Sequence, residues 1–519
     1  MFKSRLSPRG PEFAANRART LELVNELSER LARVQQGGGP AAAERMRKRG
    51  KLLPRERVEL LLDPGTPFLE LSPLAAWGMY SDECPSASQI AGIGSVAGRL
   101  CLVSANDPTV KGGAIYPVTL KKMLRAQAIA LENRLPCVYL VESAGANLTH
   151  QAELFAENGG RVFANQARMS GKGIAQVALV FGSSTAGGAY IPGLSDHVVM
   201  VRNQARVFLG GPPLVRMATG EEVDEESLGG AEMHASVSGV SDYTAVDDRD
   251  ALRLGREIVA RLAPQPVYGT RRTPSEPRLD PEELLGVVSV DPRHPFDMRE
   301  VMARIVDESE LFEFKPDYGS TLICAQAHLD GWPVGLLGNN GVLFGDSALK
   351  GAQFIQLCNQ ARTPLIYLQN ITGFMVGTKA EREGIVKHGS KLVNAVSTSS
   401  VPQLTVLVGG SYGAGNYGMC GRAFDPSFLF SWPTSRIAVM GGEQAAGVLR
   451  QVGVGEAEAE AVRQRFEEES SPYYATARLW DDALIDPRDT RRVLSLALAA
   501  VHRRDFVSQG PPRYGVFRM

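Results

Sequence analysis

Two glycine-rich segments carry the residue types best suited to chemistry. Each follows an apolar run: Gly182-Ser-Ser-Thr-Ala-Gly-Gly-Ala-Tyr190 and Gly409-Gly-Ser-Tyr-Gly-Ala-Gly-Asn-Tyr417. Glycine lets the backbone approach a ligand closely, and the first N–H groups of a helix have no partner within it. Two such groups aimed at one oxygen form an oxyanion hole, and losing one donor there costs about 100- to 1000-fold in rate. The loops predict oxyanion binding; the alternative is that the glycines only permit close helix–strand packing.

Neither segment fits the glycine motifs of other enzyme classes. Neither is a GxGxxG followed by a distal acid, nor a GxxxxGK[ST] phosphate loop. Neither contains the GxSxG elbow that exposes a nucleophilic serine. Nucleotide binding and serine hydrolysis are therefore disfavoured.

Side-chain catalysts are scarce near these loops. None of the seven histidines stands in a metal-ligand spacing such as HExxH, and no metal is expected: His150, His197, His234, His294, His328, His388 and His502. His150 and His197, the two nearest the first loop in sequence, are interpreted as structural or surface residues. Glu142, between a strand and an Ala-Gly pair, is a candidate wall residue of the site. A mechanism without a side-chain base would suit this chain.

The two halves of the chain resemble each other. At an offset of 228, Arg134-Leu-Pro-Cys-Val-Tyr-Leu matches Arg362-Thr-Pro-Leu-Ile-Tyr-Leu. The same offset pairs Lys122 with Lys350, Gly145 with Gly373, and Ala186-Gly187 with Ala414-Gly415. Asp63 pairs with Asp307 at 244, Asn106 with Asn339 at 233, and Gly210 with Gly441 at 231. The order is kept while the offset drifts slowly, which indicates an internal duplication of one domain.

Each copy alternates short apolar runs with helical patterns. The runs 138–141 and 177–181 predict strands that end in glycine loops, and helical periodicity lies between them. This alternation is typical of an α/β fold, in which ligands bind at loops after the carboxyl ends of strands.

A proline-rich stretch separates the copies. Seven of the 31 prolines fall between residues 264 and 295, which predicts an interdomain linker. We assign residues 1–268 to a first domain, 269–295 to the linker and 296–519 to a second domain.

The composition excludes several classes of protein. The 519 residues are 44% hydrophobic and 22% charged, with 56 Lys+Arg against 57 Asp+Glu. This balance disfavours generic nucleic-acid or membrane-surface binding. Two uncharged runs, 173–195 and 392–421, are broken by polar residues, glycine or proline and are interpreted as strands and loops. Six scattered cysteines and an N-terminus without an apolar signal region predict a cytoplasmic protein or one of an organelle matrix.

At the glycine loops the sequence resembles a known family, the carboxyltransferase β subunits of biotin-dependent acyl-CoA carboxylases, in the methylcrotonyl-CoA and geranyl-CoA carboxylase branch. The likeness covers nearly the whole chain. Its motifs include Val110-Lys-Gly-Gly113, Thr185-Ala-Gly-Gly-Ala-Tyr190, Phe208-Leu-Gly-Gly-Pro-Pro-Leu-Val215, Asn339-Asn-Gly-Val-Leu-Phe344, Leu368-Gln-Asn-Ile-Thr-Gly-Phe374 and Val439-Met-Gly-Gly-Glu-Gln444.

This resemblance implies a fold and a reaction. The fold would be two tandem crotonase-like (ClpP/crotonase) domains. The reaction would transfer CO2 from N-carboxybiotin to an acyl-CoA carbon, with the biotin anion taking the substrate proton. By position, the amides of Gly187 and Gly188 would hold the thioester oxygen, and those of Ala414 and Gly415 the biotin ureido oxygen. Further substrate contacts are expected from Ala144, Gly145, Gly159, Thr185, Ala186 and Phe374.

The resemblance also implies partners. The chain contains neither a Met-Lys-Met biotin site nor an ATP-binding biotin carboxylase region. Biotin must therefore come on a separate α subunit with biotin carboxylase and carrier functions. The family's site forms between the first domain of one protomer and the second domain of another, usually in a hexamer.

Two features bear on the substrate. In methylcrotonyl-type members an aromatic residue precedes the Gly-Arg of the Gly-Arg-x-Phe motif, whereas here, as in geranyl-type members, that residue is Gly159. A missing ring opens room for a longer acyl chain unless neighbouring changes refill the space. In the basic stretch after residue 44, Arg47 and Lys51 are candidates to contact CoA phosphates; the alternative is a solvated helix face.

Three other functions stay open. The first is carboxylation of a saturated acyl-CoA such as acetyl-, propionyl- or a longer acyl-CoA. The second is a biotin-independent, crotonase-type enoyl-CoA hydratase or isomerase, which would need glutamates near the first loop and only one domain. The third is a noncatalytic assembly subunit.

Overall fold

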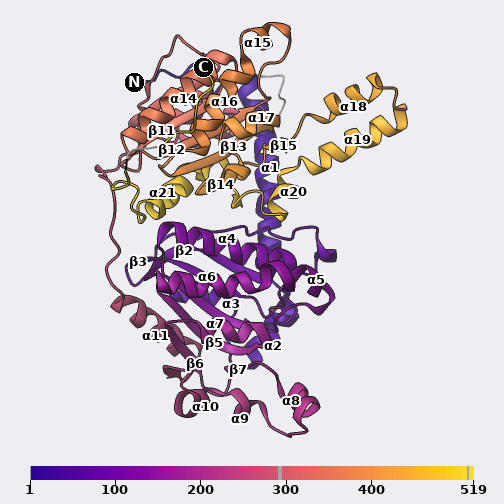
Figure 1. Cartoon of the computed structure of the whole chain (residues 1–519), viewed down its shortest axis with the longest axis vertical. Helices are drawn as coiled ribbons and strands as arrows, with labels where there is room; N and C mark the ends of the chain where they lie inside the picture. Colours follow the sequence, from indigo (N-terminus) through magenta and orange to yellow (C-terminus); the bar gives the residue numbers. More distant parts are fainter. Residues whose placement is uncertain (1, 290–294, 511–512) are drawn as a thin grey trace. The chain divides into compact units, whose positions relative to one another are not determined.

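The computed structural model describes residues 2–289, 295–510 and 513–519 (Figure 1). Pro292 and His294, within the stretch predicted as a linker, lie outside the described residues. The chain divides into two compact units. The first unit consists of residues 30–266 and 477–479, and the second of residues 1–29, 267–476 and 480–519.

The first unit is built on an eight-stranded sheet in the order β1-β2-β3-β4-β5-β6-β8, with β7 paired to β5. The first three strands pair antiparallel and the others parallel. The central strands are almost entirely apolar, as expected for parallel strands covered on both faces. The strands are β1 (Leu69–Glu70), β2 (Gln89–Val96), β3 (Arg99–Asn106), β4 (Cys137–Ser143), β5 (Gln176–Thr185), β6 (His197–Val201), β7 (Arg206–Phe208) and β8 (Tyr243–Ala245).

The second unit repeats this sheet strand for strand. Its order is β9-β10-β11-β12-β13-β14-β16, with β15 paired to β13, and the antiparallel and parallel pairs fall at the same places. The strands are β9 (Phe312–Glu313), β10 (Leu322–Leu329), β11 (Trp332–Asn339), β12 (Leu365–Ile371), β13 (Gln403–Tyr412), β14 (Phe428–Ser431), β15 (Arg436–Ala438) and β16 (Ala483–Leu484). The predicted α/β class and internal duplication are confirmed.

The helices also correspond. In the first unit α4 packs on α6 and on β2 and β3, while α3 packs on α11; in the second, α14 packs on α16 and on β10 and β11. The helices up to residue 261 are α1 (Pro11–Gln35), α2 (Pro40–Lys48), α3 (Pro54–Leu61), α4 (Pro117–Asn133), α5 (Gln151–Leu154), α6 (Gly160–Gly171), α7 (Tyr190–Gly193), α8 (Pro212–Thr219), α9 (Glu225–Gly229), α10 (Ala231–Met233) and α11 (Asp248–Arg261).

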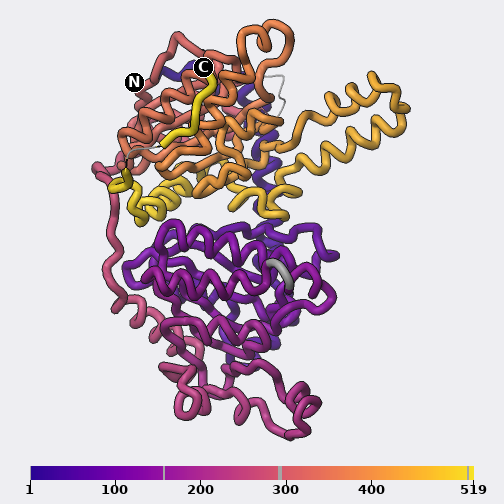
Figure 2. Tube along the Cα trace, viewed as in Figure 1, coloured from indigo at the N-terminus to yellow at the C-terminus, as the bar shows by residue number. Residues whose placement is uncertain are grey.

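The helices after residue 261 are α12 (Leu284–Val287), α13 (Met298–Ala303), α14 (Gly345–Gln360), α15 (Thr378–Arg382), α16 (Ile385–Ser397), α17 (Gly413–Gly418), α18 (Gly442–Gln451), α19 (Glu456–Glu469), α20 (Pro472–Ala477) and α21 (Thr490–Val501). Helices α18 and α19 lie side by side as a hairpin (Figure 1). The C-terminal segment, yellow in Figure 2, runs beside α16, where Gly515 lies against Asn394.

The duplication extends to individual buried contacts. An aspartate binds the N–H groups of each hairpin turn: Asp63 accepts from Ala97 and Gly98, both at 2.8 Å, and Asp307 from Asp330 and Gly331 at 2.8 and 2.9 Å. Each aspartate also pairs with an arginine. The same arginine donates a hydrogen bond to the backbone carbonyl two residues before the aspartate. These arginines are Arg256, on Asp63 and Leu61 O, and Arg491, on Asp307 and Ile305 O. The match of Asp63 with Asp307 in the sequence thus has a structural reason, because both aspartates bind the backbone of the corresponding hairpin turn.

A buried tyrosine–glutamine pair is repeated as well. Tyr139 on β4 donates to Gln176 on β5 at 2.8 Å, and Tyr367 on β12 donates to Gln403 on β13 at 2.7 Å. Corresponding residues are therefore 228 positions apart in β4 and β12, but 227 positions apart in β5 and β13. The sequence pairing of Ala186-Gly187 with Ala414-Gly415 is therefore wrong by one residue; Ala186 corresponds to Gly413, and Gly187 to Ala414.

Part of the stretch predicted as a linker is packed. Residues 281–287 form a 3-10 turn and α12, and Leu284, Leu285 and Val287 are buried there. The ring of Phe13 lies against Gly286. No helix in the described ranges is both long and apolar enough to cross a membrane.

His502 lies in the second unit, stacked on Trp332 with 3.7 Å between ring centroids, and its Nδ1 bonds to Tyr268 O at 2.6 Å. Burial lowers the pKa of His502 to about 4, against a weaker opposing effect of that hydrogen bond. Between pH 6.5 and 4 the unfolded chain therefore binds a proton that the folded chain does not.

Acidification through this window should lower the free energy of unfolding, by at most about 1.4 kcal/mol per pH unit from this group. The measurement is urea unfolding at several pH values between 4 and 7.5. His502→Phe should flatten the dependence over this window; a variant that keeps the wild-type slope would contradict the assignment.

Candidate active site at the glycine loops

Both glycine loops follow a bulge at the carboxyl end of a strand. In the first unit Val141 pairs with Val180, but the next pair is Ser143 with Ser184, so β5 carries two extra residues. In the second unit Gln369 pairs with Leu407 and Ile371 with Ser411, giving the same irregularity in β13. Bulges redirect a strand and often lie next to active sites. After the bulge, the last three residues of each strand pair with an additional short strand, β7 in the first unit and β15 in the second, before the loop begins.

In the first loop the chain leaves β5 at Thr185 and enters a 3-10 turn, η5 (Ala186–Ala189). Ala186 has a φ of 52°, in the left-handed region that residues with a side chain rarely adopt. Gly187 is exposed, Gly188 is buried, and the aromatic ring of Phe163 lies 3.4 Å from the position of a Cβ on Gly187. The N–H groups of this first turn can therefore face a ligand at the loop surface.

The second loop has the same form. Gly413 takes a φ of 54°, matching Ala186, and begins the short helix α17. Ala414 is exposed and Gly415 is buried. A Cβ on Gly415 would lie 2.4 Å from Ile371 Cγ1 and 3.1 Å from Gly373 Cα, so only glycine fits there. Ala414 and Gly415 lie in the first turn of α17, where backbone N–H groups lack helical acceptors.

The structure brings most of the predicted substrate contacts together in the first unit. Thr185 Oγ1 donates to Ala144 O at 3.3 Å, and Gly145 O accepts from Ile115 N at 2.9 Å. A Cβ on Gly145, whose φ is +87°, would lie 3.4 Å from Thr185 O. Residues 144–145 and 185–188 thus form one surface at the carboxyl ends of β4 and β5.

Gly159 ends a π-helical turn, η4 (Phe155–Gly159), directly before α6. A Cβ at this position would lie 2.6 Å from Leu154 O, so an aromatic side chain could enter only if the turn shifted. At the neighbouring Gly160 a Cβ would meet nothing within 4 Å. The absence of a side chain at residue 159 is thus tied to the local backbone.

Phe374 lies in the second unit, next to the left-handed Gly373. Its ring is half-buried against Gly389 of α16 and Gly418 of α17. It supports the second loop from within its own unit.

Lys51 is engaged in a buried ionic network that the sequence did not reveal. Its Nζ donates to Glu142 Oε1 at 2.5 Å and to Phe181 O at 2.9 Å. Glu142 also accepts from Arg57 at 2.8 Å, and Arg57 donates to Asp248 at 2.8 Å. Lys51 therefore satisfies a carbonyl of the β5 bulge and has little freedom to contact a phosphate. A glutamate in an apolar strand, such as Glu142, indicates that a buried cation lies nearby. The sequence does not identify Lys51 as that cation, because the two residues are 91 positions apart.

Arg47 is placed differently. Its side chain is 61% exposed and pairs with Glu56 at 2.8 Å. Of the two residues predicted to contact phosphates, Arg47 alone lies on the surface. Among the described residues, no cluster of three His, Cys, Asp or Glu side chains could hold a metal ion.

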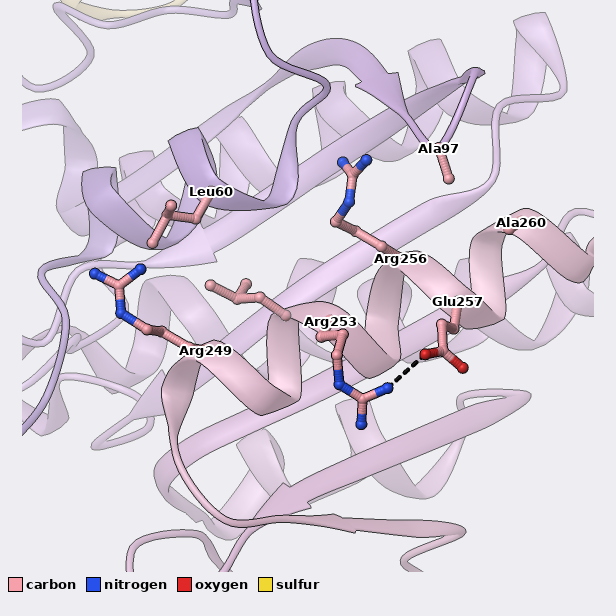
Figure 3. Close-up of a pocket in the computed structure, with 8 residues that line it drawn as sticks. Leu60, Ala97, Arg249, Arg253, Arg256, Glu257 and Ala260 are labelled. Atoms are coloured by element: carbon pink, nitrogen blue, oxygen red, sulfur yellow. Dashed lines mark hydrogen bonds and ion pairs between the residues drawn. The ribbon is translucent and has the colours of Figure 1, made fainter.

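A groove of about 400 Å³ runs along α11, on the face of the first sheet that this helix covers (Figure 3). It is lined by Leu60, by Ala97 of the β2–β3 turn and by arginines of α11. Arg253 is paired with Glu257, and Arg256 is held by Asp63. The turn at Ala97 precedes β3, whereas the glycine loops follow β4 and β5. This groove is therefore not part of the candidate site.

Comparison with known proteins agrees with this geometry. The family model described as "Carboxyl transferase domain" matches residues 45–513, so the chain belongs to that family. Its two sheets are tandem crotonase-like domains, and the chain is the carboxyltransferase β subunit of an acyl-CoA carboxylase, as the resemblance predicted.

Two relatives and one solved structure indicate the branch. The chain is 55% identical over 98% of both chains to the biotin-dependent 3-methylcrotonyl-coenzyme A carboxylase beta1 subunit of Mycobacterium tuberculosis. It is 52% identical to the mitochondrial methylcrotonoyl-CoA carboxylase beta chain of Arabidopsis thaliana, over 98% of this chain and 90% of that one. The crystal structure of the geranyl-CoA carboxylase beta subunit of P. aeruginosa superposes with a TM-score of 0.91, at 50% identity and 99% coverage of each chain.

The two loops should differ in their tolerance of a methyl group. Gly415→Ala places its Cβ against Ile371, which should cost about 1–3 kcal/mol of stability. Gly187→Ala makes only ordinary contact with Phe163, and its effect should stay within about 0.5 kcal/mol. Thermal unfolding of the two purified variants tests this; equal losses in both would contradict the described packing.

Proposed function

We propose that this chain transfers CO2 from carboxybiotin to an enoyl-CoA of the methylcrotonyl-CoA or geranyl-CoA type. The observation that carries the proposal is the repetition of one backbone device: a bulge, a left-handed residue and a short helical turn, once in each unit. Two developing oxyanions require two such sites. A hydratase would need only one, which disfavours that alternative.

In this proposal the residues of the chain bind and orient, and none takes a proton. The N–H groups of Gly187 and Gly188 hold the thioester oxygen, and their stabilisation increases as negative charge develops there. The N–H groups of Ala414 and Gly415 hold the ureido oxygen. Carboxybiotin on a partner chain supplies the CO2 and, after its release, the base.

The acyl group contacts the surface formed by Ala144, Gly145, Thr185 and Ala186. Gly159 leaves the end of η4, directly before α6, without a side chain, which favours an acyl group longer than methylcrotonyl. Phe374 contributes by fixing the second loop. Contact with the CoA phosphates rests on Arg47, because Lys51 is engaged with Glu142.

The biotin and the ATP-dependent step come from an α subunit that carries biotin carboxylase and biotin carrier functions. We further propose a homohexamer in which the first domain of one protomer meets the second domain of another. A cytoplasmic or organelle-matrix location, with no nucleic-acid or membrane partner, fits this role.

Bicarbonate fixation with the biotinylated α subunit from the same cell tests the function. The panel is acetyl-, propionyl-, 3-methylcrotonyl-, geranyl- and a long saturated acyl-CoA. We expect fixation on the two branched enoyl-CoAs, and loss of it in Gly187→Val and Gly415→Val. Hydration of an enoyl-CoA without fixation would favour the hydratase, and unchanged fixation in both variants would favour an assembly role.

The role of residue 159 has its own test. In Gly159→Phe the ring should reduce kcat/KM for geranyl-CoA by about tenfold or more relative to 3-methylcrotonyl-CoA, because the longer chain loses its space. Gly159→Ala, whose Cβ would meet the same Leu154 O at 2.6 Å without adding a ring, is the matched control and should keep the wild-type ratio. An unchanged ratio in Gly159→Phe would show that neighbouring residues set the chain length.

A further inference from the structure

A small cavity lies beneath the first glycine loop, inside the first unit. Its volume is about 30 Å³, and its lining combines the polar side chains of Gln89, Ser104, Asn106 and Ser184 and the backbone of Gly188 with apolar side chains such as Ile115, Met123, Val141 and Ile191. A cavity of this size holds one water molecule if it offers polar partners. The apolar part of the lining alone would leave the cavity dry, so a water molecule there depends on unpaired polar atoms among the lining residues.

Two of these side chains are buried without a partner. Ser184 is 0% exposed and Gln89 is 2% exposed. Ser184 Oγ and Gln89 Oε1 have no hydrogen-bond partner within the described parts of the chain. The Nε2 of Gln89 donates to Ser104 Oγ at 2.6 Å, which fixes the orientation of the amide. Each orphaned buried polar atom is costly, so a partner in the cavity is expected.

The second unit provides an internal comparison. Ser411 corresponds to Ser184, and its Oγ donates to Gln369 Oε1 at 2.5 Å and accepts from Asn416 Nδ2 at 2.7 Å. The residues that correspond to Gln369 and Asn416 in the first unit are Val141 and Ala189. The same serine therefore has two amide partners in the second unit, whereas in the first unit its hydroxyl has none within the described residues and lies beside a small cavity of mixed lining.

We propose that this cavity binds one water molecule, held by Ser184 Oγ and Gln89 Oε1, which replaces the two amides of the second unit. The water also supports the loop. The Cβ position of Gly188 lies 3.3 Å from Ser184 Oγ, so the hydrated serine packs directly beneath the backbone of Gly188. Ser184 is a positioning residue in this scheme, one step removed from the substrate.

The binding of water is tested first, without any assay of activity. A crystal structure of the full chain at about 2 Å resolution should show a solvent peak within hydrogen-bond distance of Ser184 Oγ and Gln89 Oε1. Thermal unfolding of Ser184→Ala should show a Tm about 2–4 °C lower, since a satisfied hydroxyl is lost. Ser411→Ala removes a hydroxyl that is hydrogen-bonded to Gln369 and Asn416 of the same chain. Its loss of Tm is the reference for a satisfied hydroxyl and should be at least as large as that of Ser184→Ala.

A cavity without solvent density would overturn the proposal. So would a Tm for Ser184→Ala equal to or above that of the wild type, because removing an unpaired hydroxyl relieves its burial at no cost. Both readouts are independent of the reaction, so they hold whether or not carboxylation is observed.

The supporting role rests on the proposed function and uses the acyl-CoA that the wild type carboxylates. Ser184→Ala should lower kcat several-fold with little change in the KM for acyl-CoA, because only the placement of the Gly188 N–H changes. Equal kcat values would overturn the supporting role. Absence of carboxylation in the wild type itself would instead indicate failure of the proposed function.

Discussion

Both candidate sites depend on the parallel pairing of β5 with β4 and of β13 with β12, and on the two-residue bulge that interrupts this pairing in each unit. If β5 and β13 kept a regular ladder to their ends, the glycine loops would continue as strand and their N–H groups would bond to neighbours. The two extra residues in each strand interrupt its pairing with β4 or β12, and the strand ends shortly after the pairing resumes at Ser184 or Ser411. A left-handed residue, Ala186 or Gly413, then turns the chain into a short helix.

A broken ladder leaves backbone groups to be satisfied by other means, and the two units do this differently. In the first unit the bulge carbonyl of Phe181 accepts from Lys51, whose charge is balanced by Glu142. In the second, the corresponding carbonyl of Val408 accepts from the hydroxyl of Thr434 at 2.7 Å. The first solution is ionic and draws Arg57 and Asp248 into the core, whereas the second is neutral. The duplicated fold therefore preserves the geometry of the bulge but not its chemistry.

Much of this organisation could be predicted from the sequence, because the duplication left collinear matches at anchors such as Asp63 and Asp307. The glycine loops were visible because small residues after apolar runs are rare enough to stand out. The bulges were not visible, since a two-residue irregularity near the end of a mostly apolar strand leaves no periodic signal. The offset at the loops was wrong by one residue for a related reason: glycine-rich segments match each other equally well in neighbouring registers.

Comparison of the two halves of the sequence could not show where matched residues make different contacts in the two units. Lys122 and Lys350 match at one offset, yet Lys122 Nζ donates to Ser86 O, Ser86 Oγ and Gln89 O, while Lys350 Nζ has no partner in the described ranges. The carbonyls that Lys122 binds belong to a turn in which Ser86, Ala87 and Ser88 all have positive φ. Burial lowers the pKa of Lys122 to about 7, so its three acceptors matter for keeping the charge. Identical residues at corresponding positions thus reflect the duplicated fold, whereas their contacts differ between the two units and follow from the local backbone around each residue.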